Sequence, residues 1–86
     1  MDREKINGLF EIIELILNKE PSIVDSFLFD SLNSYIYIIF PNINDKVDSL
    51  VEDIADICED ISSGDDCRTE KEELRKIYNE IKKELS

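Results

Sequence analysis

Residues 43–61 read INDKVDSLVEDIADICEDI and carry the most regular pattern in the chain. Apolar side chains recur there in steps of four and three residues, which places them on one face of an α-helix. We predict a helix over residues 43–62, with Asn42 as its N-cap and Gly64 at its C-terminus. The apolar positions of this helix are Ile43, Val47, Leu50, Ile54, Ile57 and Ile61.

The same helical spacing continues on both sides of this segment. Pro21 separates two helices on the N-terminal side, because proline disfavours helix in the residue before it. Asp66 or Thr69 is the predicted N-cap of a last helix. We expect an all-α fold, a small bundle of four antiparallel helices, built by a single domain of residues 1–86. The predicted helices cover residues 3–18, 22–40, 43–62 and 67–85.

The second predicted helix contains the one segment with strand character. Residues 35–40 read YIYIIF, a run rich in aromatic and β-branched residues. We favour a helix, because no second strand is available for pairing and a lone strand leaves backbone groups without hydrogen bonds. A break in this helix near Asn33 is left open. Its predicted core positions include Phe27, Leu32 and Ile36.

The composition excludes several classes of function. The chain of 86 residues carries 21 acidic and 10 basic side chains and no histidine, with a formal net charge of -11. This balance argues against direct nucleic-acid binding, which needs clustered lysine and arginine. Imidazole ligands and glycine-rich phosphate loops are both absent from the sequence. We therefore expect no cofactor, no metal and no enzymatic activity.

The sequence also predicts the cellular location of the protein and the state of its thiols. Residues 1–5 alternate acid and base, unlike a signal peptide, and the longest apolar run is six residues against about 20 for a membrane span. We expect a soluble cytoplasmic protein that does not bind membranes. Cys58 and Cys67 flank the predicted turn between the last two helices, so we expect neighbouring reduced thiols. Whether they pair is left open.

The negative charge is concentrated in one part of the chain. Residues 41–66 hold nine acidic side chains and one basic one, and so carry eight of the eleven net negative charges. Five of the acids are spaced three or four residues apart and form one stripe along the predicted helix, where they repel one another. The simpler alternative is that this acidic stripe is only a solvated outer face of the helix. We predict instead that a basic protein partner binds here, with Tyr37 as an added aromatic anchor. The predicted partner-binding residues are Tyr37, Asp45, Asp48, Glu52, Asp53, Asp56, Glu59, Asp60, Asp65 and Asp66.

In size, acidity, lack of catalytic residues and helical layout, the chain resembles the bacterial immunity proteins that neutralise nuclease toxins. The Ser-Gly-Ser-Asp and Tyr-Tyr-Pro signature of the colicin DNase branch is absent, and Ser63-Gly64-Asp65 is only a fragment of it. No functional residue is therefore carried over from that family. The resemblance implies an acidic inhibitor that binds the basic nucleic-acid-binding surface of a nuclease.

Two alternatives stay open. The first is a phage-encoded inhibitor of a host nucleic-acid enzyme, such as an anti-CRISPR protein, whose carboxylates mimic DNA phosphates. The second is a non-catalytic oligomerisation module, in which the apolar seam of residues 43–61 pairs with its own copy. The chain is accordingly a monomer or a homodimer.

Overall fold

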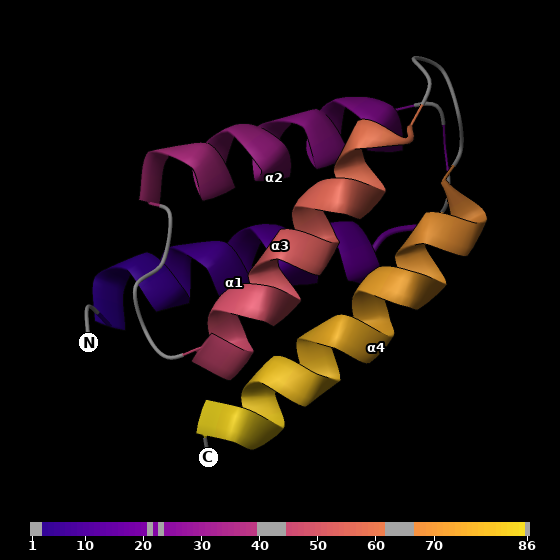
Figure 1. Cartoon of the computed structure of the whole chain (residues 1–86). Helices are drawn as coiled ribbons and strands as arrows, with labels where there is room; N and C mark the ends of the chain where they lie inside the picture. Colours follow the sequence, from indigo (N-terminus) through magenta and orange to yellow (C-terminus); the bar gives the residue numbers. More distant parts are fainter. Residues whose placement is uncertain (1–2, 21, 23, 40–44, 62–66, 86) are drawn as a thin grey trace.

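The computed structural model consists of four α-helices (Figure 1). They are α1 (Arg3–Leu17), α2 (Asp25–Ile39), α3 (Asp45–Glu59) and α4 (Arg68–Leu85). The structure describes residues 3–20, 22, 24–39, 45–61 and 67–85, and within these ranges it contains no strand. The predicted all-α fold is confirmed. The predictions made for Asn42, Ile43, Gly64, Asp65 and Asp66 lie outside the described residues.

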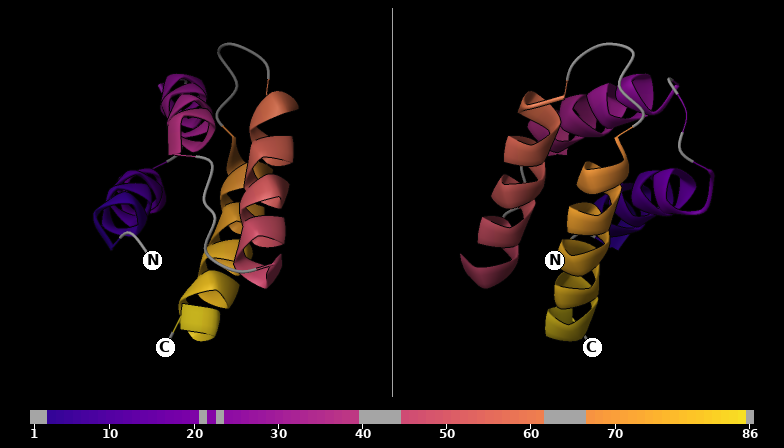
Figure 2. Two further views of the ribbon diagram at one scale, coloured as in Figure 1. Left: turned by 60° about the vertical axis from the view of Figure 1, so that its left-hand side comes forward. Right: turned by 90° about the vertical axis from the view of Figure 1, so that its right-hand side faces the viewer.

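The helices form two antiparallel hairpins, α1 with α2 and α3 with α4. The second hairpin crosses the first at a steep angle, so the fold has two layers (Figure 2). Contacts run from α1 to α2, α2 to α3, α3 to α4 and α4 back to α1, and in the described ranges no Cα atoms of the diagonal helices lie within 8 Å of one another. None of the helices, as described, is long and apolar enough to cross a membrane.

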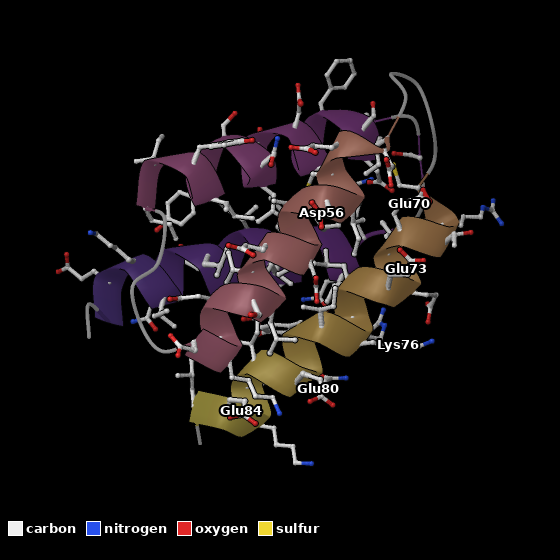
Figure 3. The ribbon with its side chains drawn as sticks, in the orientation of Figure 1. Asp56, Glu70, Glu73, Lys76, Glu80 and Glu84 are labelled. Atoms are coloured by element: carbon white, nitrogen blue, oxygen red, sulfur yellow. The ribbon has the colours of Figure 1, made fainter. Side chains whose placement is uncertain are left out.

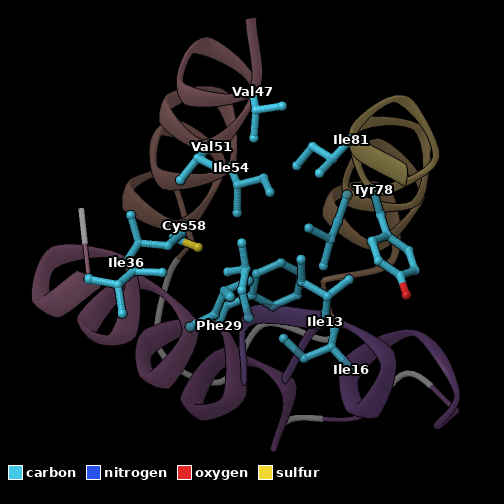
Figure 4. Close-up of a cluster of buried hydrophobic side chains, with 14 of the residues drawn as sticks. Ile13, Ile16, Phe29, Ile36, Val47, Val51, Ile54, Cys58, Tyr78 and Ile81 are labelled. Carbon is cyan, nitrogen blue, oxygen red and sulfur yellow. The ribbon is translucent and has the colours of Figure 1, made fainter. Parts of the chain in front are cut away.

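All four helices contribute side chains to one core between the two layers (Figure 4). Ile13, Ile54 and Leu74 are fully buried there, as the helical spacing predicted. The prediction for Phe27 is wrong, since its side chain is 62% exposed and Phe29 fills the core instead. Phe29 is in phase with the other buried residues of α2 (Leu32, Ile36 and Ile39), whereas Phe27 lies two residues earlier and faces away.

Helix α2 is continuous through Asn33 to Ile39, so the YIYIIF segment is helical as far as the structure describes it and no break occurs. The helix begins at Asp25 rather than at Ser22. At its start, the Asp25 amide donates to the Ser22 carbonyl oxygen at 3.1 Å. In return, the Ser22 amide donates to Asp25 Oδ2 at 3.1 Å.

The start of α4 also differs from prediction. Thr69 lies inside the helix and is not its N-cap. Cys67 occupies the position before the helix, and its carbonyl oxygen accepts the first helical hydrogen bond from the Lys71 amide at 2.9 Å. Cys67 has a φ of 59°, in the left-handed region that residues other than glycine rarely adopt. The chain therefore turns sharply into α4 at a fully buried residue.

A buried ion cluster joins three helices at one end of the molecule. The Asp25 carboxylate has no exposed surface, and it binds Lys19 Nζ at 2.9 Å and Lys71 Nζ at 3.0 Å. Lys71 Nζ also donates to the Lys19 carbonyl oxygen at 2.8 Å. Burial alone would raise the pKa of Asp25, but the hydrogen bonds from Lys19, Lys71 and Ser22 outweigh it and leave the pKa lowered. The cluster fixes the first turn of α4 against the turn between α1 and α2.

Replacing Asp25 with asparagine should destabilise the fold, because it leaves two ammonium groups without their shared carboxylate. We expect a loss of about 3 kcal/mol in the free energy of unfolding at neutral pH. Because the folded state lowers this pKa, the stabilisation is complete above the unfolded pKa of about 3.9 and is lost as the pH falls through the folded value. Urea unfolding should therefore show the two proteins converging below about pH 4.

The matched control is Asp30→Asn, which changes an exposed aspartate of the same helix. It should change the unfolding free energy by no more than about 0.5 kcal/mol. A loss for Asp25→Asn that is no larger than that of the control would contradict a stabilising role for the cluster.

Gly8 allows the ring of Tyr35 to lie against α1. A Cβ atom at residue 8 would lie 2.9 Å from Cζ of Tyr35 and would also overlap its hydroxyl oxygen. That hydroxyl donates to the Lys5 carbonyl oxygen at 3.0 Å. A side chain at residue 8 would therefore displace the ring from its contact with α1.

We predict that a Gly8→Ala change makes two opposite contributions to the free energy of unfolding. Alanine favours helix over glycine by about 1 kcal/mol, but its methyl group displaces Tyr35. In a Tyr35→Ala background only the helical gain remains. Urea unfolding of the four proteins should show Gly8→Ala to be more favourable in that background than in the wild type. Equal effects in both backgrounds would contradict the close contact.

Candidate functional site

The acidic stripe of α3 borders a groove between α2 and α3. Four carboxylate residues of α3, together with Tyr37 of α2, form its rim, and the volume is about 220 Å³. The rim residues from α3 are Asp48, Glu52, Asp56 and Glu59, and the apolar residues of the groove are Ile36, Val51 and Ala55. We call this feature the acidic groove.

Tyr37 joins the two sides of the groove. Its side chain is 65% exposed, and its hydroxyl donates to Glu59 Oε1 at 3.3 Å. The structure therefore brings together the predicted aromatic residue and four of the predicted acidic ones, although Tyr37 and Glu59 lie on different helices.

The remaining predicted acids do not line the groove. Asp53 follows the groove residue Glu52 and so points about 100° further round the helix axis, and Asp60 lies just beyond the end of α3. Asp45, the first residue of α3, is exposed beyond the end of the groove. Asp65 and Asp66 lie outside the described residues. The candidate site is thus smaller than the predicted stripe.

The described lining of the groove consists of acidic, aromatic and aliphatic side chains. Among its described lining residues there is no lysine or arginine. Lys46, the one basic residue of α3, lies 3.4 Å from Glu84 of α4 instead. The outer side of α4 carries mixed charges, where Lys76 lies among acidic residues (Figure 3). The net negative charge of the described helices is therefore concentrated along α3.

The groove offers hydrogen-bond acceptors above an apolar base. No group of three or more cysteine or acidic side chains in the described ranges is arranged to hold a metal ion. Carboxylate oxygens and a tyrosine ring next to aliphatic carbon suit an organic cation, since the charged group binds the oxygens and its carbon stem packs below. Lysine and arginine side chains have this chemistry.

The apolar residues of the groove are the part that sequence reasoning missed. Ala55 lies in the same row as Asp48, Glu52 and Glu59, at the helical spacing i, i+4, i+7 and i+11. Its methyl group leaves room where a longer side chain would fill the space. A helical projection of residues 45–59 contains the signal for the groove, which is a small residue in a row of acidic ones.

The strongly shifted pKa values belong to residues away from the groove. Burial, and then a 2.8 Å hydrogen bond to Glu14, raise the pKa of Tyr78 to about 12. Phe10 packs edge-on against this ring at 5.1 Å, and Lys82 Nζ lies 5.0 Å from its centre. The contacts of Tyr78 with Glu14 and Phe10 join α1 to α4, so their role is to hold the fold together.

The two cysteines are core residues. Both are buried and carry thiols rather than a disulfide. Burial raises the pKa of the Cys58 thiol to about 12, and the charges of Asp30 and of Cys67 add to the effect. The predicted proximity of the two residues is therefore consistent with their electrostatic interaction. A thiol with this pKa forms little thiolate at neutral pH and is a poor nucleophile.

Cys58 should resist alkylation in the folded protein. Treatment with iodoacetamide at pH 8 should modify it on the order of 1,000-fold more slowly than in urea, because the unfolded thiol has a pKa near 8.5. Mass spectrometry of digested samples measures the two rates. Rapid labelling in the folded protein would show that this thiol is accessible and ionised.

Comparisons of the chain with protein-family models, with curated proteins and with solved structures find no match. The residues and geometry of the acidic groove therefore indicate what the chain can bind. The separate parts of the groove are a row of carboxylates, an exposed tyrosine and an apolar base.

Proposed function

We propose that this protein is a non-catalytic acidic inhibitor whose acidic groove binds the basic nucleic-acid-binding surface of a nuclease, as a toxin immunity protein does. The observation that carries the proposal is that Tyr37 of α2 and four carboxylate residues of α3 line the same groove. A partner that supplies lysine or arginine side chains would neutralise carboxylates that repel one another in the free protein.

The groove suits a long basic side chain in three respects. Its aliphatic stem would pack on Val51 and Ala55, and its cationic group would reach Glu52 or Asp56 on the rim. The exposed face of Tyr37 offers a cation–π contact beside them. Each of these interactions favours a cation and disfavours an anion such as a nucleic-acid phosphate.

The size of the groove favours a protein partner over a small molecule. Small-molecule pockets commonly measure about 300–1,000 Å³ and enclose their ligand. The acidic groove has about 220 Å³ and opens to solvent along α2 and α3. It therefore fits one or two side chains that project from a larger surface.

A phage-encoded inhibitor of a host nucleic-acid enzyme, such as an anti-CRISPR protein, is a second candidate. The spacing of the groove carboxylates supports it, because side chains three or four residues apart on a helix rise by about 4.5–6 Å and form a regular anionic row. Such a row can occupy a site that otherwise binds backbone phosphates. Both candidates are inhibitors, and they differ in the gene that accompanies them.

Self-association through the seam of residues 43–61 finds less support. Val47 and Ile54 of this seam are buried in the core of a single chain. They are not available to a second copy while the chain is folded.

Reversing the charge of the groove should weaken binding to basic partners. We expect the triple change Glu52→Lys, Asp56→Lys and Glu59→Lys to weaken binding of an arginine-rich peptide by at least about 10-fold, because close interfacial charge pairs contribute about 1.5 kcal/mol or more. Isothermal titration calorimetry measures the affinity. The free variant should be at least as stable as the wild type, since repulsion along α3 is removed.

The matched control is Glu72→Lys, Glu73→Lys and Glu80→Lys, which makes the same change in net charge on exposed positions of α4. Equal losses in both variants would mean that net charge alone drives binding and would contradict a specific groove. Affinity capture with the two variants then identifies partners that require the groove. A groove-dependent partner without a basic nucleic-acid-binding surface would disprove the proposed inhibitor.

A further inference from the structure

Exposed large apolar side chains gather on and beside α2. Ile38 is 81% exposed, Phe27 62% and Val24, directly before the helix, 49%. Leu15 is the one comparable residue on α1, and none occurs on the described parts of α3 or α4. Single exposed apolar residues are ordinary, whereas several on one element mark an interaction surface.

Four residues of α2 form a continuous outer strip. Phe27, Ser31, Ser34 and Ile38 follow the helical spacing i, i+4, i+7 and i+11, which places them on one side of the helix. With Ile12, Asp30 and Tyr35 they line a shallow hollow of about 480 Å³ beside α1. This outer strip of α2 lies on a different side of the helix from Ile36 and Tyr37, which line the acidic groove.

The charge distribution indicates what covers the outer strip. Two copies of a chain with a net charge of -11 repel one another, most strongly where α3 would meet α3. The outer strip contains no charged residue, and Asp30 stands at the edge of the hollow. It is therefore a surface on which two copies make apolar contact without placing acidic rows face to face.

We infer that the outer strip of α2 binds a second copy of this chain across a two-fold axis. The order of its side chains is bulky, small, small, bulky, and this order is unchanged when the helix is reversed. Antiparallel pairing about a point between residues 32 and 33 sets Phe27 against Ile38 of the second copy. The same pairing sets Ser31 against Ser34 of the second copy, where short side chains let the helices approach closely.

The hollow gives Phe27 a place in this dimer. Ile38 borders the hollow and Phe27 of the second copy faces Ile38, so each phenyl ring enters the hollow of the other chain. A two-fold arrangement uses the same surface on both copies and stops at the dimer. An interface built mainly on one helix per copy buries less surface than the roughly 1,200–2,000 Å² typical of stable complexes. The dimer is therefore weak.

Sedimentation velocity over loading concentrations from about 10 μM to about 1 mM tests the inference. The wild type should pass from monomer to dimer over this range. Ile38→Lys should raise the dissociation constant at least about 10-fold, because it places an ammonium group in an apolar contact. Ile38 is too exposed to support the core, and circular dichroism checks that the helices of the variant are retained.

The matched control is Leu15→Lys, which changes an exposed apolar residue of α1 that does not line the hollow. It should dimerise like the wild type. A wild type that stays monomeric at every concentration would overturn the inference and leave the strip to another protein. Species larger than a dimer, a dimer that survives Ile38→Lys, or an equal loss in the control would overturn it as well.

The test of the dimer can succeed or fail independently of the test of the proposed inhibitor. The groove variant with lysine at residues 52, 56 and 59 should still form the dimer, because its changes lie on α3. Ile38→Lys should still bind the arginine-rich peptide. Loss of dimer formation in the groove variant would overturn the assignment of the contact to α2.

Discussion

The rest of the structure depends on one buried carboxylate. Asp25 lies at the start of α2, where its charge requires the ammonium groups of Lys19 and Lys71. The first of these follows α1 and the second belongs to the first turn of α4, so the carboxylate sets α4 against the first hairpin. Because α3 packs antiparallel on α4, it is thereby placed beside α2. The acidic groove exists only through that placement.

The groove forms at the boundary between two faces of α3. One face carries the apolar residues that fill the core, and the other carries acids that remain in water. Where the boundary meets α2, Val51 and Ala55 form an apolar base below a rim of carboxylates. A helix whose acids all lay opposite its core face would present charge without a groove. The partial overlap of the two faces is what makes a cationic side chain a suitable ligand.

Sequence periodicity was sufficient for the four helices because each has a regular apolar face. It was insufficient where a choice depended on tertiary neighbours. Phe27 and Phe29 are both apolar, and only the packing of α2 on α1 and α3 decides that Phe29 is buried. Cys67, and not Thr69, precedes α4. The cause is the left-handed backbone conformation of Cys67, which helix propensities do not predict. The acidic row was predictable from spacing, whereas its apolar base required knowing that α2 lies alongside it.

The order of helix contacts has a consequence for how the chain folds. Two of the four helix interfaces lie within a hairpin, α1 with α2 and α3 with α4, and such local contacts form quickly because only short loops must close. The other two interfaces join the hairpins, and α1 meets α4 through groups as far apart in sequence as Glu14 and Tyr78, which are separated by 64 residues. Each hairpin can therefore assemble on its own, in about microseconds to milliseconds. Docking of the hairpins then completes the acidic groove, so the groove is among the last features of the molecule to form.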